Sequence, residues 1–161
     1  MSPRSMIDRS LRRVAIAGAA AAMTLAASAA LAGQCPADKV MPDAVKSGET
    51  MPKDVTDTVL ATVDLSKEAI AANDRQLRMR RLEIKPGGVV PWHNHADRPA
   101  IIYIIKGTII EHASNCAVPI VHKAGEVSKD AGLSHWWKNT GKETVVLISA
   151  DILHDPADKN M

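Results

Sequence analysis

The segment GGVVPWHNH, residues 87–95, decides how the chain is interpreted. It opens with a glycine pair typical of a turn and continues as a run whose valine and tryptophan residues favour a β-strand. Side chains alternate between the two faces of a strand, so His93 and His95 point the same way. One metal ion could therefore bind both imidazoles.

A third histidine, His135, lies forty residues further on, early in another predicted strand and just after a turn at Gly132. Three neutral imidazoles that converge inside a barrel would bind a divalent metal ion such as Fe, Mn, Zn, Ni or Cu. They would also leave coordination positions for water or substrate. We predict that His93, His95 and His135 are metal ligands.

The remainder of the chain predicts an all-β protein, because short β-type runs follow one another from residue 56 and turn residues end each of them. Strands in such number must close into a barrel or a sandwich to hide their edges. We expect a small antiparallel β-barrel. The predicted strands are residues 58–65, 76–84, 89–95, 100–105, 108–113, 119–123, 126–129, 134–139 and 144–151.

Three local features accompany these strands. We expect residues 86–88 to turn the chain between two separate strands, and residues 108–113 to be the hairpin partner of residues 100–105. Residues 66–73 could form one or two helical turns, with Ser66 as the cap.

The glycines and histidines resemble the two motifs of the cupin family. The first consists of Gly87, five residues, His93-Asn94-His95 and then Gly107 after a β-branched strand. The second comprises Gly125, Gly132, His135 and Asn139. The resemblance covers residues 77–151 and implies a jelly-roll barrel whose motif histidines coordinate a metal. Barrels of this family are often dimers, so a homodimer is also expected.

The chain departs from the family pattern at the carboxylate ligand. The first motif usually carries a Glu three or four residues after its second His, and here Pro99 and Ala100 occupy those places. Three neutral imidazoles leave the full charge on the ion, which favours anionic ligands. Three-histidine sites of this kind resemble those of cupin-like dioxygenases. Two alternatives stay open: Asp97 could replace the Glu as a fourth ligand, or the metal could be lost and leave a polar pocket.

Other side chains were weighed as pocket residues. Trp137 shares the face of His135 in its predicted strand and is a candidate for lining the pocket, the alternative being a core or interface position. Arg78 and Arg80 share a strand face, which is either solvated or able to meet an anionic substrate. The remaining histidines are interpreted as surface or strand residues: His112, His122 and His154.

The N-terminus has the order of an export signal, with four arginines, an uncharged Ala-rich run and a small-residue end at residues 30–32. We expect cleavage near Ala32 and a periplasmic or secreted protein that contacts the membrane only through this segment. An uncleaved anchor and twin-arginine export are the alternatives. The predicted division is 1–32 signal peptide, 33–55 irregular arm, 56–152 barrel and 153–161 tail.

Charge and cysteines limit the partners. Without the signal segment the chain has 16 basic and 17 acidic residues, so no basic stripe for nucleic acid is expected. Cys35 and Cys116 could pair in an oxidising compartment or remain as two thiols.

Together these features predict a metal-dependent, Fe-type dioxygenase-like enzyme that acts on a small anionic molecule. The alternative is a non-enzymatic periplasmic protein that binds a metal or a small ligand.

Overall fold

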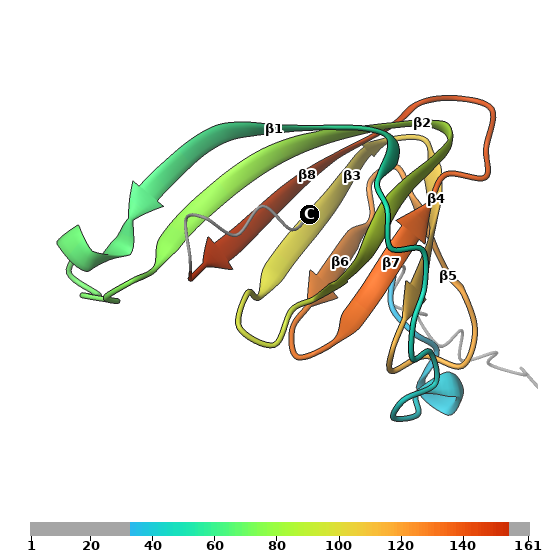
Figure 1. Cartoon of the computed structure of the whole chain (residues 1–161), viewed down its shortest axis with the longest axis horizontal. Coiled ribbons are helices and arrows are strands. Elements are labelled where there is room, and N and C mark those ends of the chain that lie inside the picture. The colour runs from blue at the N-terminus through green and yellow to red at the C-terminus, as the bar shows by residue number, and fades with distance from the viewer. Residues whose placement is uncertain (1–32, 155–161) are drawn as a thin grey trace, which may run out of the picture.

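The computed structural model describes residues 33–154. The predicted signal peptide, and residues 155–161 of the predicted tail, lie outside this range. The described residues form an all-β, nearly closed antiparallel barrel, which confirms the predicted fold class (Figure 1). The elements are the 3-10 helices Ala37–Lys39 and Leu65–Lys67 and the strands β1 Lys53–Asp64, β2 Gln76–Asn94, β3 Ala100–Lys106, β4 Thr108–Ala113, β5 Ile120–Lys123, β6 Val127–Asp130, β7 Ser134–Lys138 and β8 Val145–Leu153.

The longest strand, β2, joins the two halves of the barrel. Its first part pairs with β8 on one edge and β1 on the other, and its last part pairs with β7. The prediction of two separate strands with a chain reversal at residues 86–88 was therefore wrong. Gly87 has φ 77°, which kinks the strand without reversing it. The kink lets one strand carry residues of the barrel wall and of the histidine site.

The order of the strands is β5-β4-β7-β2-β8-β3-β6, with β1 alongside β2. The predicted hairpin of residues 100–105 with residues 108–113 was wrong, because β3 pairs with β6 and β8 whereas β4 pairs with β5 and β7. Gly107, with φ 84°, sends the chain across the barrel. This crossing is what places consecutive strands in opposite halves, as a jelly roll requires.

The helical turn after β1 is shorter than expected. Only Leu65–Lys67 is helical, and its N-cap is Asp64 and not Ser66. The Asp64 carboxylate accepts hydrogen bonds from the backbone N–H of Ser66 at 3.1 Å and from its hydroxyl at 2.7 Å. A carboxylate caps a helix as well as a hydroxyl does, so the sequence pattern alone could not choose between these neighbours.

The apolar core lies at one end of the barrel interior, where inward side chains of β2, β3 and β8 meet those of β4 and β7. The residues at this end are almost fully buried: Leu82, Ile84, Val90, Ile102, Ile104, Ile109, Trp137, Val145 and Leu147. Towards the other end the inward positions of the same strands become polar. The polar side chains of the interior therefore lie in a barrel that the apolar core at its other end stabilises.

The N-terminal arm is attached to the barrel by a disulfide and by backbone hydrogen bonds. Cys35 and Cys116 are bonded, and Val40 forms a β-bridge with Cys116. Further along, the backbone N–H of Trp92 donates to the carbonyl of Glu49 at 2.6 Å. The arm thus lies beside the strands that carry the histidines.

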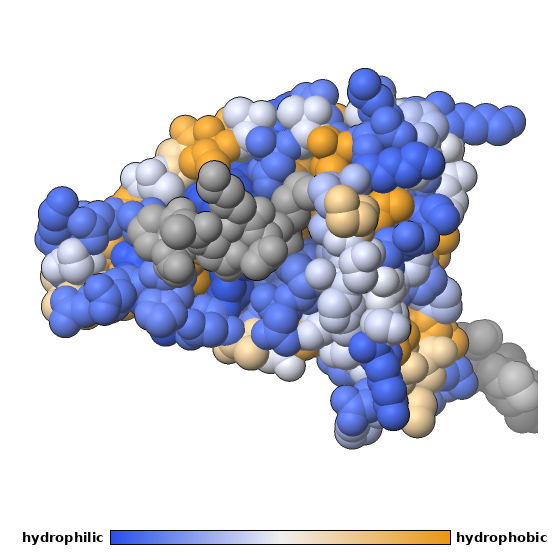
Figure 2. All heavy atoms as spheres, in the orientation of Figure 1, coloured by the Kyte–Doolittle hydropathy of each residue, from blue (hydrophilic) through white to orange (hydrophobic). Residues whose placement is uncertain are grey.

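The outer surface carries several exposed apolar side chains on β2 and β3, the two strands that flank β8. Leu77 and Met79 of β2 and Ile101 and Tyr103 of β3 are each 42–58% exposed. Figure 2 shows hydrophobic areas separated by a largely hydrophilic surface on the face in view. The expected homodimer stays a prediction. Among residues 33–154 no helix is long and apolar enough to cross a membrane.

We predict that replacing both cysteines, Cys35→Ser with Cys116→Ser, lowers the free energy of unfolding. The disulfide closes a loop of 81 residues, and the chain-entropy estimate for a loop of this size is about 4 kcal/mol, of which a native bridge commonly delivers about 2–4 kcal/mol. Urea unfolding of the oxidised protein, the reduced protein and the double variant measures the loss. Equal stability of all three would contradict the prediction.

Candidate metal centre

The backbone brings the three predicted ligands together. His93 and His135 are cross-strand partners in the β2–β7 pair, and on β7 His135 shares its face with Trp137, which points into the core. His95 follows the end of β2, and its backbone is held by hydrogen bonds with Leu133 at 2.7 Å and Gly132 at 3.0 Å. The turn before β7 therefore fixes the one histidine that lies beyond the strand.

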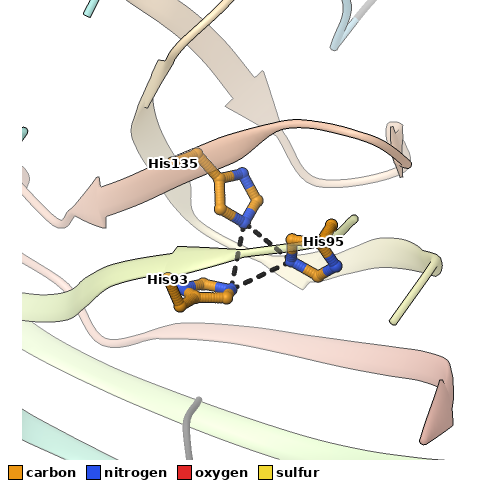
Figure 3. A group of neighbouring side chains, drawn as sticks. All are labelled: His93, His95 and His135. Carbon is orange, nitrogen blue, oxygen red and sulfur yellow. Dashed lines mark hydrogen bonds between the residues drawn. The ribbon is translucent and has the colours of Figure 1, made fainter. Parts of the chain in front are cut away.

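The Nε2 atoms of the three imidazoles form a small triangle (Figure 3). The separation is 3.0 Å from His95 to His93, 3.0 Å from His95 to His135, and 3.1 Å from His135 to His93. Metal–nitrogen bonds of ~2.1 Å place neighbouring ligands of an octahedral ion ~3.0 Å apart. The triangle matches one face of such a coordination sphere.

Hydrogen bonds on the far side of each ring determine which nitrogen carries the proton. His93 Nδ1 lies 2.8 Å from the carbonyl of Pro91, and His95 Nδ1 lies 2.6 Å from the carbonyl of Arg98. His135 Nδ1 lies 2.5 Å from a carboxylate oxygen of Glu111. The two carbonyls and the Glu111 carboxylate only accept, so an Nδ1–H donates to each of them and each Nε2 presents a lone pair. At His135 the short contact with Glu111 decides this tautomer over the longer contact of 3.1 Å with the Trp137 Nε1–H. Three lone pairs that face one another repel unless a cation lies among them, so the residues fit a metal ion.

The surroundings keep His93 and His95 neutral. Burial lowers the pKa of His93 to about 2, with the positive charge that His135 would carry as a second cause. Burial likewise lowers the pKa of His95 to about 4. Neutral imidazoles are the form that binds metals, so these two histidines need not lose a proton at neutral pH.

Glu111 supplies a carboxylate behind the ligands. It is 2% exposed on β4 and bonds His135 Nδ1 through one oxygen and His122 Nε2 through the other, at 2.7 Å. Burial opposes its ionisation, but the hydrogen bonds from the two histidines keep its pKa below the usual value. A carboxylate behind a ligating histidine orients the ring and raises its basicity.

A second carboxyl group, Asp130, lies near this pair. One oxygen of each of Glu111 and Asp130, with a ring nitrogen of His135, fall within 4.8 Å of one another. Burial raises the pKa of Asp130 to about 6, and its Oδ1 accepts a hydrogen bond from the Ser128 hydroxyl at 2.7 Å. Both carboxyls sit on strands that face the histidines, and their roles were not apparent from spacing.

The structure does not bring Asp97 into the triangle. Its carboxylate is 61% exposed and is paired with Arg75 at 2.8 Å and His154 at 2.6 Å. Strand β2 ends at Asn94. The alternation of side chains along a strand therefore does not extend to Asp97 and does not direct it towards the histidines. The proposal of Asp97 as a fourth ligand is corrected: the nearest carboxylate to the ligands, Glu111, acts from behind His135.

The structure decides two positions for which the sequence allowed a solvated side chain. His122 is a strand residue of β5, fully buried, and stacks on Trp137 with ring centroids 4.4 Å apart. Arg78 and Arg80 are 8% and 4% exposed, because the face of β2 that carries them points into the polar half of the barrel. Both guanidinium groups pair with Asp151 of β8. The sequence alone could not show this pairing, because it does not reveal which strand lies beside β2.

A cavity of about 20 Å³ adjoins the triangle. Trp137 is among the lining residues and also places its Nε1 3.1 Å from His135 Nδ1. None of the lining residues is acidic. They are Arg80, Leu82, Val90, His93, His95, Ile102, Trp137, Leu147 and Ser149. Two of the three imidazoles therefore border a mostly apolar cavity that also contains an arginine and a serine.

These features define a small antiparallel β-barrel with an interior three-histidine centre. Residues 80–151 match the family model described as "Cupin domain". The fold and this match show that residues 80–151 are similar to cupin domains.

Comparison with known proteins gives the same fold. A predicted oxalate decarboxylase from Thermotoga maritima has 28% sequence identity and a TM-score of 0.51, over 74% of this chain and 98% of that one. An oxalate oxidase in complex with glycolate has 23% identity and a TM-score of 0.50, over 70% and 58% of the two chains, which supports the fold alone. Auxin-binding protein ABP19a of Prunus persica is 30% identical over 77 residues, 47% of this chain and 37% of that relative. The match thus spans little more than a third of the curated relative's length.

We predict that Glu111→Gln weakens metal binding about 10- to 100-fold, the usual effect of removing a partner behind a ligand. The amide keeps the shape but loses the charge that strengthens His135 as a ligand. Competition of the purified protein with a chromophoric chelator measures the affinity. The control is Glu143→Gln, which removes an exposed carboxylate paired with Lys106. Equal affinity of the two variants would show that Glu111 does not support the centre.

We predict that the metal-free protein loses stability as the pH falls from 6.5 towards 4. In this window the unfolded chain takes up protons on His93 and His95, whereas the folded chain resists them because their pKa values are lowered. Asp130, with its raised pKa, acts in the opposite sense below about pH 6, but it is one group against two. Urea unfolding across this range gives the slope, and a flat or inverted profile would contradict the assignment of neutral histidines.

Proposed function

We propose that this chain is a metal-dependent cupin enzyme that acts on a small anionic molecule, with Fe-type, dioxygenase-like oxidoreductase chemistry. The observation that carries the proposal is the triangle of three Nε2 lone pairs beside a cavity. A redox-active divalent ion held there supplies Lewis acidity and coordination positions for substrate and oxygen. A neutral ligand set leaves its charge uncompensated, which favours an anion.

The side chains of the barrel have separate tasks in this proposal. His93, His95 and His135 hold the ion, and Glu111 orients His135. The apolar part of the cavity lining keeps bulk water out, and it consists of Leu82, Leu147, Ile102 and Trp137 among others. Since no carboxylate lines it, proton transfer by a side chain in direct contact with the substrate has no obvious donor, and a reaction centred on the metal is favoured over acid–base hydrolysis.

Export is part of the proposal. We infer a periplasmic or secreted protein because disulfides persist in oxidising compartments, and the Cys35–Cys116 bond joins the start of the described chain to the barrel. N-terminal sequencing of the protein from its native compartment, with cleavage expected near Ala32, tests this.

A second candidate function is a non-enzymatic metal or small-ligand binder. The absence of a carboxylate from the cavity lining also favours this role, since binding needs no acid or base. Turnover separates the two: an enzyme consumes oxygen with a substrate, and a binder holds metal or ligand without any reaction.

We predict that the native protein contains close to one equivalent of a divalent metal and that His135→Ala loses most of it. Elemental analysis after purification measures the content. The control is His112→Ala, because His112 stacks on Trp136 away from the triangle. Oxygen uptake is then measured with small carboxylates, including oxalate, and with thiols and diketones. Retention of metal by His135→Ala would refute the centre, and tightly held metal without turnover would leave the binder.

A further inference from the structure

The cavity beside the metal centre is lined by two unlike pairs of polar side chains. The first wall is formed by His93, at the end of β2, and by His95, which follows that strand. The second wall is formed by Arg80 of β2 and Ser149 of β8, which are cross-strand partners. A molecule bound to an ion on the histidines would share this small cavity with a guanidinium and a hydroxyl.

Both groups on the second wall have unused hydrogen-bonding capacity. Arg80 is 4% exposed and binds Asp57 at 2.5 Å through one terminal nitrogen and Asp151 at 3.4 Å through the other. Its Nε has no hydrogen-bond partner among residues 33–154, and the same holds for the Oγ of Ser149, which is 2% exposed. Buried donors without partners are uncommon and costly, which indicates that a ligand satisfies them.

Charged side chains surround this wall. Arg78, Arg80 and Arg98 are all buried near the carboxylate of Asp151, and Asp57 also pairs with Arg80. A guanidinium forms its strongest hydrogen bonds with carboxylates and similar anions, so Arg80 favours an anionic ligand in the cavity.

The size of the cavity restricts that anion. A volume of about 20 Å³ holds only one or two water molecules, since one water needs roughly 10–15 Å³. The two oxygens of a planar carboxylate fill such a space. A tetrahedral phosphate or sulfate is larger in every direction.

We propose that Arg80 and Ser149 form the recognition site for a carboxylate of a small substrate held at the metal centre. This inference rests on the proposed function and names its substrate class. The Nε–H of Arg80 and the O–H of Ser149 donate to the carboxylate oxygens, and the positive charge of Arg80 attracts the anion. The apolar remainder of the lining excludes larger or more polar ligands.

Formate binding to the cobalt-loaded chain, residues 33–161, tests the proposal. Co²⁺ replaces the native ion and reports ligand binding through its visible absorption spectrum. We expect saturable binding of formate and at least tenfold weaker binding of inorganic phosphate. Ser149→Ala and Arg80→Lys should each weaken formate binding about 10-fold or more, the range for hydrogen bonds to a charged group, with cobalt affinity unchanged within twofold. Arg80→Lys keeps the charge for Asp57 and Asp151, so the fold is preserved.

The matched control is Ser128→Ala. Ser128 is a buried serine in the same cross-strand row as Ser149, with Ile102 between them, but its hydroxyl already bonds Asp130. It should bind formate as the unaltered chain does. If cobalt does not bind at all, the proposed function fails. If cobalt binds but formate does not, or binds all variants equally, only the carboxylate site is wrong. Tighter binding of phosphate than formate would also overturn it.

Discussion

Three imidazole nitrogens point their lone pairs at one another at 3.0–3.1 Å in the interior of the barrel. This arrangement is unfavourable without a cation, because the lone pairs repel one another and burial lowers the pKa of His93 and His95 and so opposes their protonation. The barrel imposes it through the cross-strand pairing of His93 with His135 and through the backbone bonds that hold His95. The other polar groups of the interior are arranged around this constraint.

Two sets of buried charge flank the triangle. Behind His135, Glu111 accepts hydrogen bonds from two histidines. On β2 and β8, Asp151 pairs with buried arginines. A carboxylate in direct contact with the proposed ion is not needed for negative charge to reach it, since a hydrogen bond through an imidazole transmits part of that charge. In the proposed centre Glu111 would lie behind one ligand, and Arg80 would lie in the adjoining cavity, where it favours an anion.

The position of Glu111 also explains how a cupin-like barrel can lack the carboxylate of the first motif. Pro99 and Ala100 occupy the places where that ligand is usual, and Ala100 is buried beside Asp130 and Asp151 as their cross-strand neighbour. A glutamate side chain there would add a third buried carboxylate to this row. The charge lies instead on β4, where two histidines pair with it.

The sequence by itself determined the barrel, the three histidines and the opportunity for a disulfide, because period-two alternation, glycine turns and motif spacing are local properties of the chain. Alternation also placed Trp137 on the face of His135. Alternation could not show which elements lie beside one another. For that reason three expectations were wrong: the hairpin of residues 100–105 with residues 108–113, a solvated position for Arg78 and Arg80, and Asp97 as a ligand. Glu111, His122 and Asp151 acquire their roles only when β4, β5 and β8 are folded against β2 and β7. Burial and charge pairing depend on contacts between distant segments, so only the tertiary structure decided the chemistry around the histidines.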